Sequence, residues 1–143
     1  MKKLLILALF ATISTAALPQ AVVATMRAGL TSSVDSVRSV GTTPVYLYVS
    51  PTANYTCGSF QAEITRVSTA IAGSITMQGS LDGTNWYNAS NAAGDTLTIA
   101  NSASQAQRLK VPASYGLYFK HYRLAIVGAS SDTLTARAKF AAR

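Results

Sequence analysis

The sequence has few of the residues on which catalytic and metal sites depend. Its 143 residues include one histidine and one cysteine, and charged residues make up 12%, about half the share of an average soluble domain. The single Cys57 excludes an intrachain disulfide. One imidazole and one thiol are too few for a zinc site, which takes three or four such ligands. Because His121 lies inside a strand-like run, we expect it on a sheet face, and we expect no enzymatic activity, metal or cofactor.

The sequence also lacks an apolar run long enough to cross a bilayer. Its most apolar segment, from Leu4 to Leu18, is fifteen residues long and is interrupted by Thr and Ser, whereas a membrane-spanning helix needs about 20 apolar residues. Two lysines precede this segment, and small residues end it at Ala17 and again at Ala24. This layout is typical of a secretory signal peptide. An assembly arm that packs on a neighbouring subunit and a helix that contacts a membrane are the alternatives.

The sequence does contain an excess of positive charge in its last quarter. The net charge is +7, and seven of the twelve Lys and Arg residues lie between Arg108 and Arg143, where Asp132 is the only acid. Such asymmetry is typical of a surface that faces nucleic acid, anionic lipid or an acidic protein. The alternative is a solvated sheet face, and no nucleic-acid-binding motif accompanies the charge.

Apolar residues recur with the period of β-strands. The segment 59–67 alternates apolar and polar residues, and so does the segment from Asp132 onward, while Val45–Val49 is a β-branched and aromatic run between two prolines. Period two indicates half-buried strands. About eight short strands separated by turns predict an all-β fold, an antiparallel β-sandwich or a jelly-roll-like barrel.

The chain is expected to divide into three parts. An N-terminal apolar arm or helix occupies 1–28, an extended linker occupies 29–44, and the β-sandwich domain occupies 45–143. Large apolar side chains within the last part are the candidates for its core, because burying them supplies most of the folding free energy. The predicted core residues are Phe60, Trp86, Phe119, Leu134 and Phe140.

One surface patch is predicted from the last two strand-like runs. If 117–127 pairs with 132–143, basic and aromatic residues from both runs gather on one outward face. Tyr and Arg are enriched in interface hot spots, and basic residues interleaved with aromatics also suit nucleic acid or sugars. Either Lys120 with its tyrosines or Arg123 with His121 would join Arg137 and Lys139 there, because consecutive strand residues point to opposite faces. A subunit interface, a solvated face and a ligand site therefore stay open for this patch, whose candidate members are Lys120, Tyr122, Arg123, Arg137 and Lys139.

The segment from Gly79 to Tyr87, Gly-Ser-Leu-Asp-Gly-Thr-Asn-Trp-Tyr, predicts a hairpin. The Asp82-Gly83 pair favours a tight turn. The next strand begins near Trp86, whose large apolar side chain is expected to fold back as a lid. This sequence motif, followed by the Tyr/Arg-rich run 118–124, resembles small β-sandwich modules in the virion proteins of tailed bacteriophages. It also occurs in sugar-binding and adhesive modules.

The resemblance implies a non-enzymatic structural component of a phage virion, in the capsid, its decoration or the tail. Implied partners are copies of the chain and other virion proteins, and the implied location is the virion. The basic last quarter is a candidate contact for nucleic acid or another anionic surface, and the N-terminal segment is a candidate membrane contact. The alternative is a secreted or bacterial cell-surface module that binds carbohydrate or forms a filament.

Overall fold

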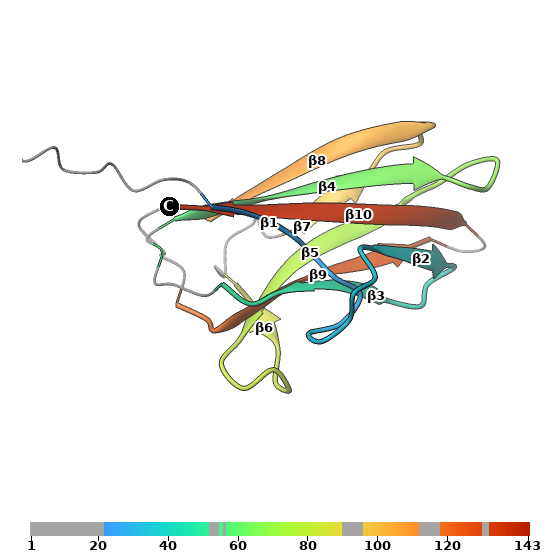
Figure 1. Cartoon of the computed structure of the whole chain (residues 1–143). Helices are drawn as coiled ribbons and strands as arrows, with labels where there is room; N and C mark the ends of the chain where they lie inside the picture. Colours follow the sequence, from blue (N-terminus) through green and yellow to red (C-terminus); the bar gives the residue numbers. More distant parts are fainter. Residues whose placement is uncertain (1–21, 52–54, 56, 90–95, 112–117, 130–131) are drawn as a thin grey trace, which may run out of the picture.

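The computed structural model describes residues 22–51, 55, 57–89, 96–111, 118–129 and 132–143. These residues form ten β-strands and no helix. The strands make two five-stranded sheets in which every pairing is antiparallel. The sheets face one another as the two layers of a sandwich (Figure 1). The predicted all-β antiparallel sandwich is therefore confirmed for the described residues.

The first sheet, called sheet A here, is built around the last strand. Strand β10 is paired along one edge by both β1 and β2, and along the other edge by β4, which pairs in turn with β8. The strands of sheet A are β1 (Val22–Thr25), β2 (Ser36–Val40), β4 (Gly58–Arg66), β8 (Ser104–Val111) and β10 (Thr133–Ala142).

The second sheet, called sheet B here, is built around β9 and β5. Strand β3 pairs with β9, β9 pairs with β5, and the far edge of β5 is shared by β6 and β7. The strands of sheet B are β3 (Val45–Val49), β5 (Gly73–Ser80), β6 (Tyr87–Asn88), β7 (Thr96–Ile99) and β9 (His121–Gly128).

Eight of the ten strands, β3 to β10, lie after residue 44. The other two, β1 and β2, come from the segments expected to be the apolar arm and the linker, and both pair with β10. The sandwich thus begins well before residue 45. Most of the predicted signal or arm segment, 1–21, lies outside the described residues. Among those that are described, no helix has the length and apolarity to cross a membrane.

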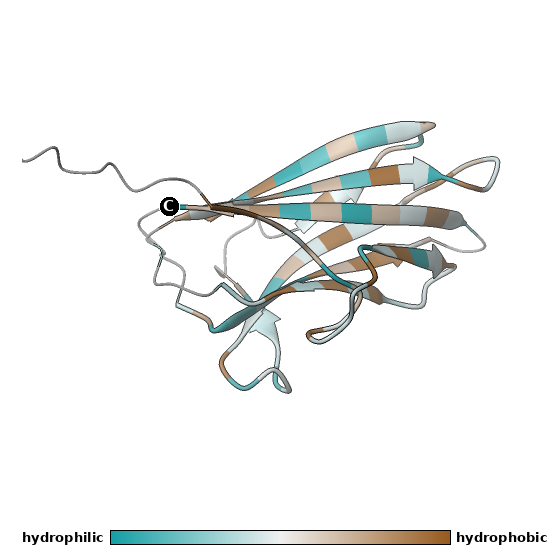
Figure 2. Ribbon diagram, viewed as in Figure 1, coloured by the Kyte–Doolittle hydropathy of each residue, from teal (hydrophilic) through white to brown (hydrophobic). Residues whose placement is uncertain are grey.

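The core lies between the sheets because each strand turns alternate residues inward. Figure 2 shows this as alternating hydrophilic and hydrophobic bands along β4, β8 and β10. At the centre of the core is an aromatic cluster in which the Phe60 ring lies 4.9 Å from that of Phe140 and 5.8 Å from that of Tyr122. Phe60, Leu134 and Phe140 are buried, and Phe119 is partly buried and packs against this cluster.

The two open sides of the sandwich are closed by backbone and amide hydrogen bonds. On one side Met26 is buried, and Arg27 exchanges backbone hydrogen bonds with Tyr48 of β3, which ties the chain after β1 to sheet B. On the other side Gln105 donates to the Ala100 carbonyl at 2.6 Å and accepts from the Ala100 N–H at 3.1 Å. Both bridges hold the sheets in one relative position, because each joins a strand of one sheet to the segment that follows a strand of the other.

Candidate functional site

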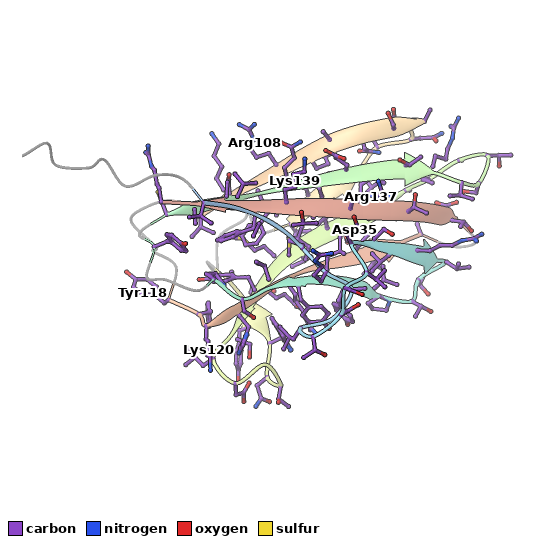
Figure 3. The ribbon with its side chains drawn as sticks, in the orientation of Figure 1. Asp35, Arg108, Tyr118, Lys120, Arg137 and Lys139 are labelled. Carbon is purple, nitrogen blue, oxygen red and sulfur yellow. The ribbon has the colours of Figure 1, made fainter. Side chains whose placement is uncertain are left out.

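The predicted five-residue patch does not form, because its members lie on different sheets. Strands β9 and β10 follow one another in sequence but do not pair: β9 is in sheet B and β10 is in sheet A. Arg137 and Lys139 point away from the outer surface of sheet A, whereas Lys120 lies next to sheet B (Figure 3). The expected pairing of 117–127 with 132–143 is corrected by this topology.

Tyr122 is the second correction. It was a candidate for the outward face, together with Lys120, yet it is 1% exposed and its ring stacks on Phe140. The Phe119 backbone N–H donates a hydrogen bond to the Tyr122 hydroxyl at 3.1 Å, so the buried phenol is satisfied. Burial raises the pKa of Tyr122 above its ordinary value. Tyr122 is therefore a core residue, and its neighbour Arg123 points outward.

A basic surface nevertheless exists on sheet A, and it contains more cations than predicted. Strand register places Lys139 beside Gln61 and Gln61 beside Arg108, in one row across the outer face. Arg137, in the next row, is paired with Ser36 and Glu63. All five cations on this face are exposed; we call them the basic face: Arg38, Arg108, Lys110, Arg137 and Lys139.

The basic face has little negative charge to neutralise it. Glu63 lies opposite Arg137 in the register, and Asp35 precedes β2. Neither forms an ion pair with a cation of the basic face within the described part of the chain, and Glu63 instead accepts a hydrogen bond from Gln61 at 3.5 Å. A groove over β10, lined by Ser36, Glu63, Thr65, Thr135 and Arg137, hollows this face.

The outer face of sheet B carries a different kind of site. Tyr46 and Tyr48 are outward neighbours on β3, and the register places Arg123 of β9 between Tyr48 and Gln78 of β5. The Arg123 guanidinium lies 4.0 Å from the centre of the Tyr46 ring and 4.4 Å from that of the Trp86 ring. We call these side chains the arginine–aromatic cluster: Tyr46, Tyr48, Gln78, Trp86 and Arg123.

The guanidinium is held in a defined orientation by its neighbours. Arg123 Nε donates to Gln78 Oε1 at 2.7 Å, and the two cation–π contacts each contribute about 0.5–1 kcal/mol or more. The Tyr48 ring meets the Trp86 ring edge-on at 5.5 Å. No described residue accepts a hydrogen bond from the two terminal nitrogens of Arg123, so this side of the guanidinium is available to an anionic or carbonyl group.

Trp86 therefore lies on the outside of sheet B. It was expected in the core, but it is partly buried and does not belong to the buried cluster between the sheets. The antiparallel pairing of β5 with β6 that the hairpin motif predicts is present. Its loop folds over the outer face of sheet B, so the lid that Trp86 forms covers Tyr48 and Arg123.

Asp82 fixes the shape of this loop. One oxygen, Oδ1, accepts hydrogen bonds from the Thr84 and Asn85 N–H groups at 2.8 Å and from Ser80 Oγ at 2.9 Å. Oδ2 accepts from Asn85 Nδ2 at 2.7 Å. These donors, the Asn85 and Thr84 backbone N–H groups first, hold the pKa of Asp82 well below its ordinary value of 3.8.

Gly83 allows the loop to pack closely. Its φ of 76° is in the left-handed region that favours glycine. A Cβ at this position would lie 3.1 Å from Leu30 Cδ1 and 3.6 Å from His121 Cδ2, so the loop rests on both residues. The hydrogen bonds of Asp82 and the conformation of Gly83 together place Trp86 above Arg123.

His121 starts β9, and its Nδ1 forms a hydrogen bond with Ser50 Oγ at 2.7 Å. Among the described residues no carboxylate is hydrogen-bonded to this pair, and no group of three His, Cys, Asp or Glu side chains is suited to a metal ion. Cys57 is a free, partly buried thiol.

The sequence indicated Arg123 and Trp86 but did not predict that their side chains are in contact. It did not identify Tyr46 and Tyr48 as site residues. The signal was present: Tyr46 and Tyr48 are two apart in a predicted strand, so they share one face. The same is true of Arg108 and Lys110, which complete the basic face. Which strands are neighbours, however, is set by pairings between distant segments.

Similarity between this chain and known proteins is found only at the level of structure. No protein-family model and no curated protein sequence matches the chain. A mitogen derived from Yersinia pseudotuberculosis is similar with a TM-score of 0.46 and 13% identity, over 87% of this chain and 86% of the mitogen.

Two further solved structures are similar to a comparable degree. The VP2 subviral particle of infectious bursal disease virus gives a TM-score of 0.49 and 16% identity over 87% of this chain, which spans 32% of VP2. A mutant of a family 29 carbohydrate-binding module gives a TM-score of 0.42 and 10% identity over 86% of this chain and 92% of the module. None of these TM-scores reaches 0.5, so the three likenesses assign neither a family nor a function to the chain.

Proposed function

We propose that this protein is a non-enzymatic structural subunit of a bacteriophage virion, which assembles with copies of itself and with other virion proteins. The observation that carries the proposal is the arginine–aromatic cluster. It gathers two Tyr, one Trp and one Arg on the outer face of a sheet, and these residue types dominate the binding energy of protein interfaces.

Exposed apolar side chains surround this cluster. Leu81 and Tyr87 flank the loop that carries Trp86, and they are 68% and 64% exposed. Leu30, which contacts the same loop, is 43% exposed. An oriented guanidinium bordered by apolar side chains is the arrangement expected of an interface centre, because the apolar rim excludes water from the charged contact.

The assignment to a phage virion rests on a second observation, the resemblance of the segment 80–87 to phage virion modules. The proposed position is in the capsid, in its decoration or in the tail. The absence of an enzymatic role is part of the proposal: Ser50 and His121 form a pair in which no carboxylate of the described residues orients the imidazole, whereas a Ser-His-Asp site requires one.

The test is the assembly state of the full chain and of two variants with one new charge each. Leu81→Asp places a carboxylate in the apolar rim, and Val40→Asp places one at an exposed apolar residue of sheet A. Sedimentation velocity over a range of concentrations, with electron microscopy, should show multi-subunit particles for the wild type and for Val40→Asp. Leu81→Asp should sediment as a monomer.

Two results would contradict this proposal. One is a wild-type chain that stays monomeric at every concentration. The other is an equal effect of both variants, which would assign assembly to overall charge and not to the cluster. Circular dichroism of each variant establishes that the fold is retained; both sites are exposed, so substitutions there change stability little.

The second candidate function is a secreted or surface module that binds carbohydrate. The observation in its favour is that the terminal nitrogens of Arg123 lie beside aromatic rings, an arrangement that suits a sugar carboxylate. Isothermal titration of the wild type and of Arg123→Gln with oligouronates tests it. Intact mass of the protein from its native source separates the two functions, because an exported protein loses its signal peptide.

A further inference from the structure

The basic face has a chemistry unlike that of the arginine–aromatic cluster, and it calls for a different partner. Its cations come from three strands of one sheet, β2, β8 and β10. In a sheet, outward residues on one strand are about 6.8 Å apart and neighbouring strands about 4.8 Å apart. Arg137 and Lys139 are thus one such step apart, and Arg108 lies two strands away from Lys139.

The folded chain brings these five cations together with a single carboxylate, Glu63, among the described outward residues of β4 and β10. Like charges on neighbouring strands repel, which costs stability. No ion pair offsets that cost for Arg38, Arg108, Lys110, Arg137 or Lys139 within the part of the chain that the structure describes. An anionic partner that spans several strands would neutralise all of them at once.

The side chains between the cations indicate which anion fits. Outward positions of β4 and β10 carry Gln61, Thr65 and Thr135, whose hydroxyl and amide groups donate hydrogen bonds to phosphate oxygens. Glu63 is the one carboxylate among these outward positions, opposite Arg137 in the register. No described outward residue of this sheet is aromatic. Stacking on bases is therefore absent from this face, and only the phosphate backbone can be contacted.

The same inventory disfavours the other anionic partners. A protein interface is depleted in charge at its centre and enriched in Tyr, Trp, Phe, Met and Arg, whereas the described outward residues of this face include Arg but no aromatic residue and no Met. Binding at a lipid surface would use apolar side chains inserted between headgroups. On this face the exposed valines, Val23 and Val40, lie on the edge strands β1 and β2.

We propose that the basic face of sheet A binds nucleic acid through its phosphates, without sequence preference and without a preference for single strands. If each of the five cations neutralises one phosphate, the logarithm of the association constant should fall linearly with the logarithm of the salt concentration. The expected slope on duplex DNA is about −4.5. This inference does not depend on the proposed assembly role, because it uses the opposite sheet.

The experiment measures fluorescence anisotropy of a labelled 20-base-pair duplex, and of one of its strands, with the full chain at several salt concentrations. The test variant replaces Arg108, Arg137 and Lys139 by Gln. Its matched control replaces Arg27, Arg66 and Lys120 by Gln, three cations outside the basic face, so that both proteins carry the same net charge.

The test variant should bind the duplex about a hundredfold more weakly at 0.1 M salt, with a slope smaller in magnitude by about 3. The control should keep the wild-type slope within about 1. If the triple variant does not fold by circular dichroism, Lys139→Gln against Lys120→Gln repeats the comparison with one charge, and a slope change of about 1 is expected for the first alone.

Several outcomes would overturn the inference. Equal losses in the test and control variants would mean that overall charge, not this face, attracts DNA. Absence of duplex binding at 50 mM salt would exclude the site, and so would tight binding to phosphatidylserine vesicles with none to DNA, which would assign the face to a membrane. By contrast, DNA binding that is retained in Leu81→Asp would support the inference, because it would show that this site is separate from the assembly surface.

Discussion

Replacing Gly79 by Ala tests whether the aromatic core is packed as described. Gly79 is a buried residue of β5, and the Phe119 ring lies directly over it. A Cβ at Gly79 would be 2.8 Å from Phe119 Cε2 and closer still to Cδ2 and Cγ. The ring would have to move, and with it the edge-on contact to Tyr122 at 5.9 Å.

The cost follows from these contacts. Forcing extra volume into a packed core costs about 1–3 kcal/mol, and losing the edge-on ring pair adds about 0.5–1.5 kcal/mol. We therefore expect Gly79→Ala to lower the free energy of unfolding by about 2–4 kcal/mol. Gly29→Ala is the control, because a Cβ there would lie 3.4 Å from Ser32 Cβ and 3.9 Å from Ser32 N, both ordinary contacts, and should change stability by less than about 0.5 kcal/mol.

A double-mutant cycle measured by urea unfolding gives the decisive result. In a Phe119→Ala background the space above Gly79 is empty, so adding Gly79→Ala should change the free energy of unfolding by no more than about 0.5 kcal/mol. The coupling between the two sites should then be about 2 kcal/mol or more. If Gly79→Ala costs the same in both backgrounds, or nothing in the wild type, the packing of Phe119 on Gly79 is refuted.

Two further predictions concern the core and the loop that carries Trp86. Phe60→Ala should cost about 3–5 kcal/mol in urea unfolding, because the ring is fully buried between Tyr122 and Phe140; a cost below about 1 kcal/mol would contradict that burial. The lowered pKa of Asp82 means that its carboxylate stabilises the fold fully above its ordinary value of 3.8 and progressively less as the pH falls below it. The stability difference between wild type and Asp82→Asn should therefore shrink from pH 4 towards pH 2, and a difference independent of pH would exclude the Asp82 hydrogen bonds as its source.

The existence of the strands was predictable because their signal is local. Alternation in 59–67 and from Asp132 onward corresponds to β4 and β10, since the side-chain period of a strand is two wherever one face is buried. Strands β1 and β2 were harder to recognise: their exposed outward positions and short lengths weaken the alternation, and their pairing with β10 supplies the stability that the local sequence lacks.

The inward face of β9 was not predictable from its own sequence. Polar and aromatic residues occur on both faces of this run, so alternation alone does not choose between Tyr122 and Arg123. The choice is made by neighbours: Phe60 and Phe140 of sheet A leave an aromatic site that Tyr122 fills, and Tyr46 with Trp86 provide a place for the guanidinium on the outside. Burying a tyrosine with its hydroxyl bonded costs far less than burying a charged arginine.

The sequence by itself determined that the chain forms antiparallel strands, that its cations gather in the last quarter, and that a turn occurs at Asp82-Gly83. These features depend on residues close together in the chain. Only the tertiary structure decided which cations share a surface and where Trp86 lies. Strands β9 and β10 are consecutive in the chain yet belong to different sheets, so Arg123 and Arg137 lie on different surfaces. Pairings between distant segments place Arg38, Arg108 and Lys139 on one face. The physical reason is that register and partner choice are set by burial of the common core, to which every strand contributes at once.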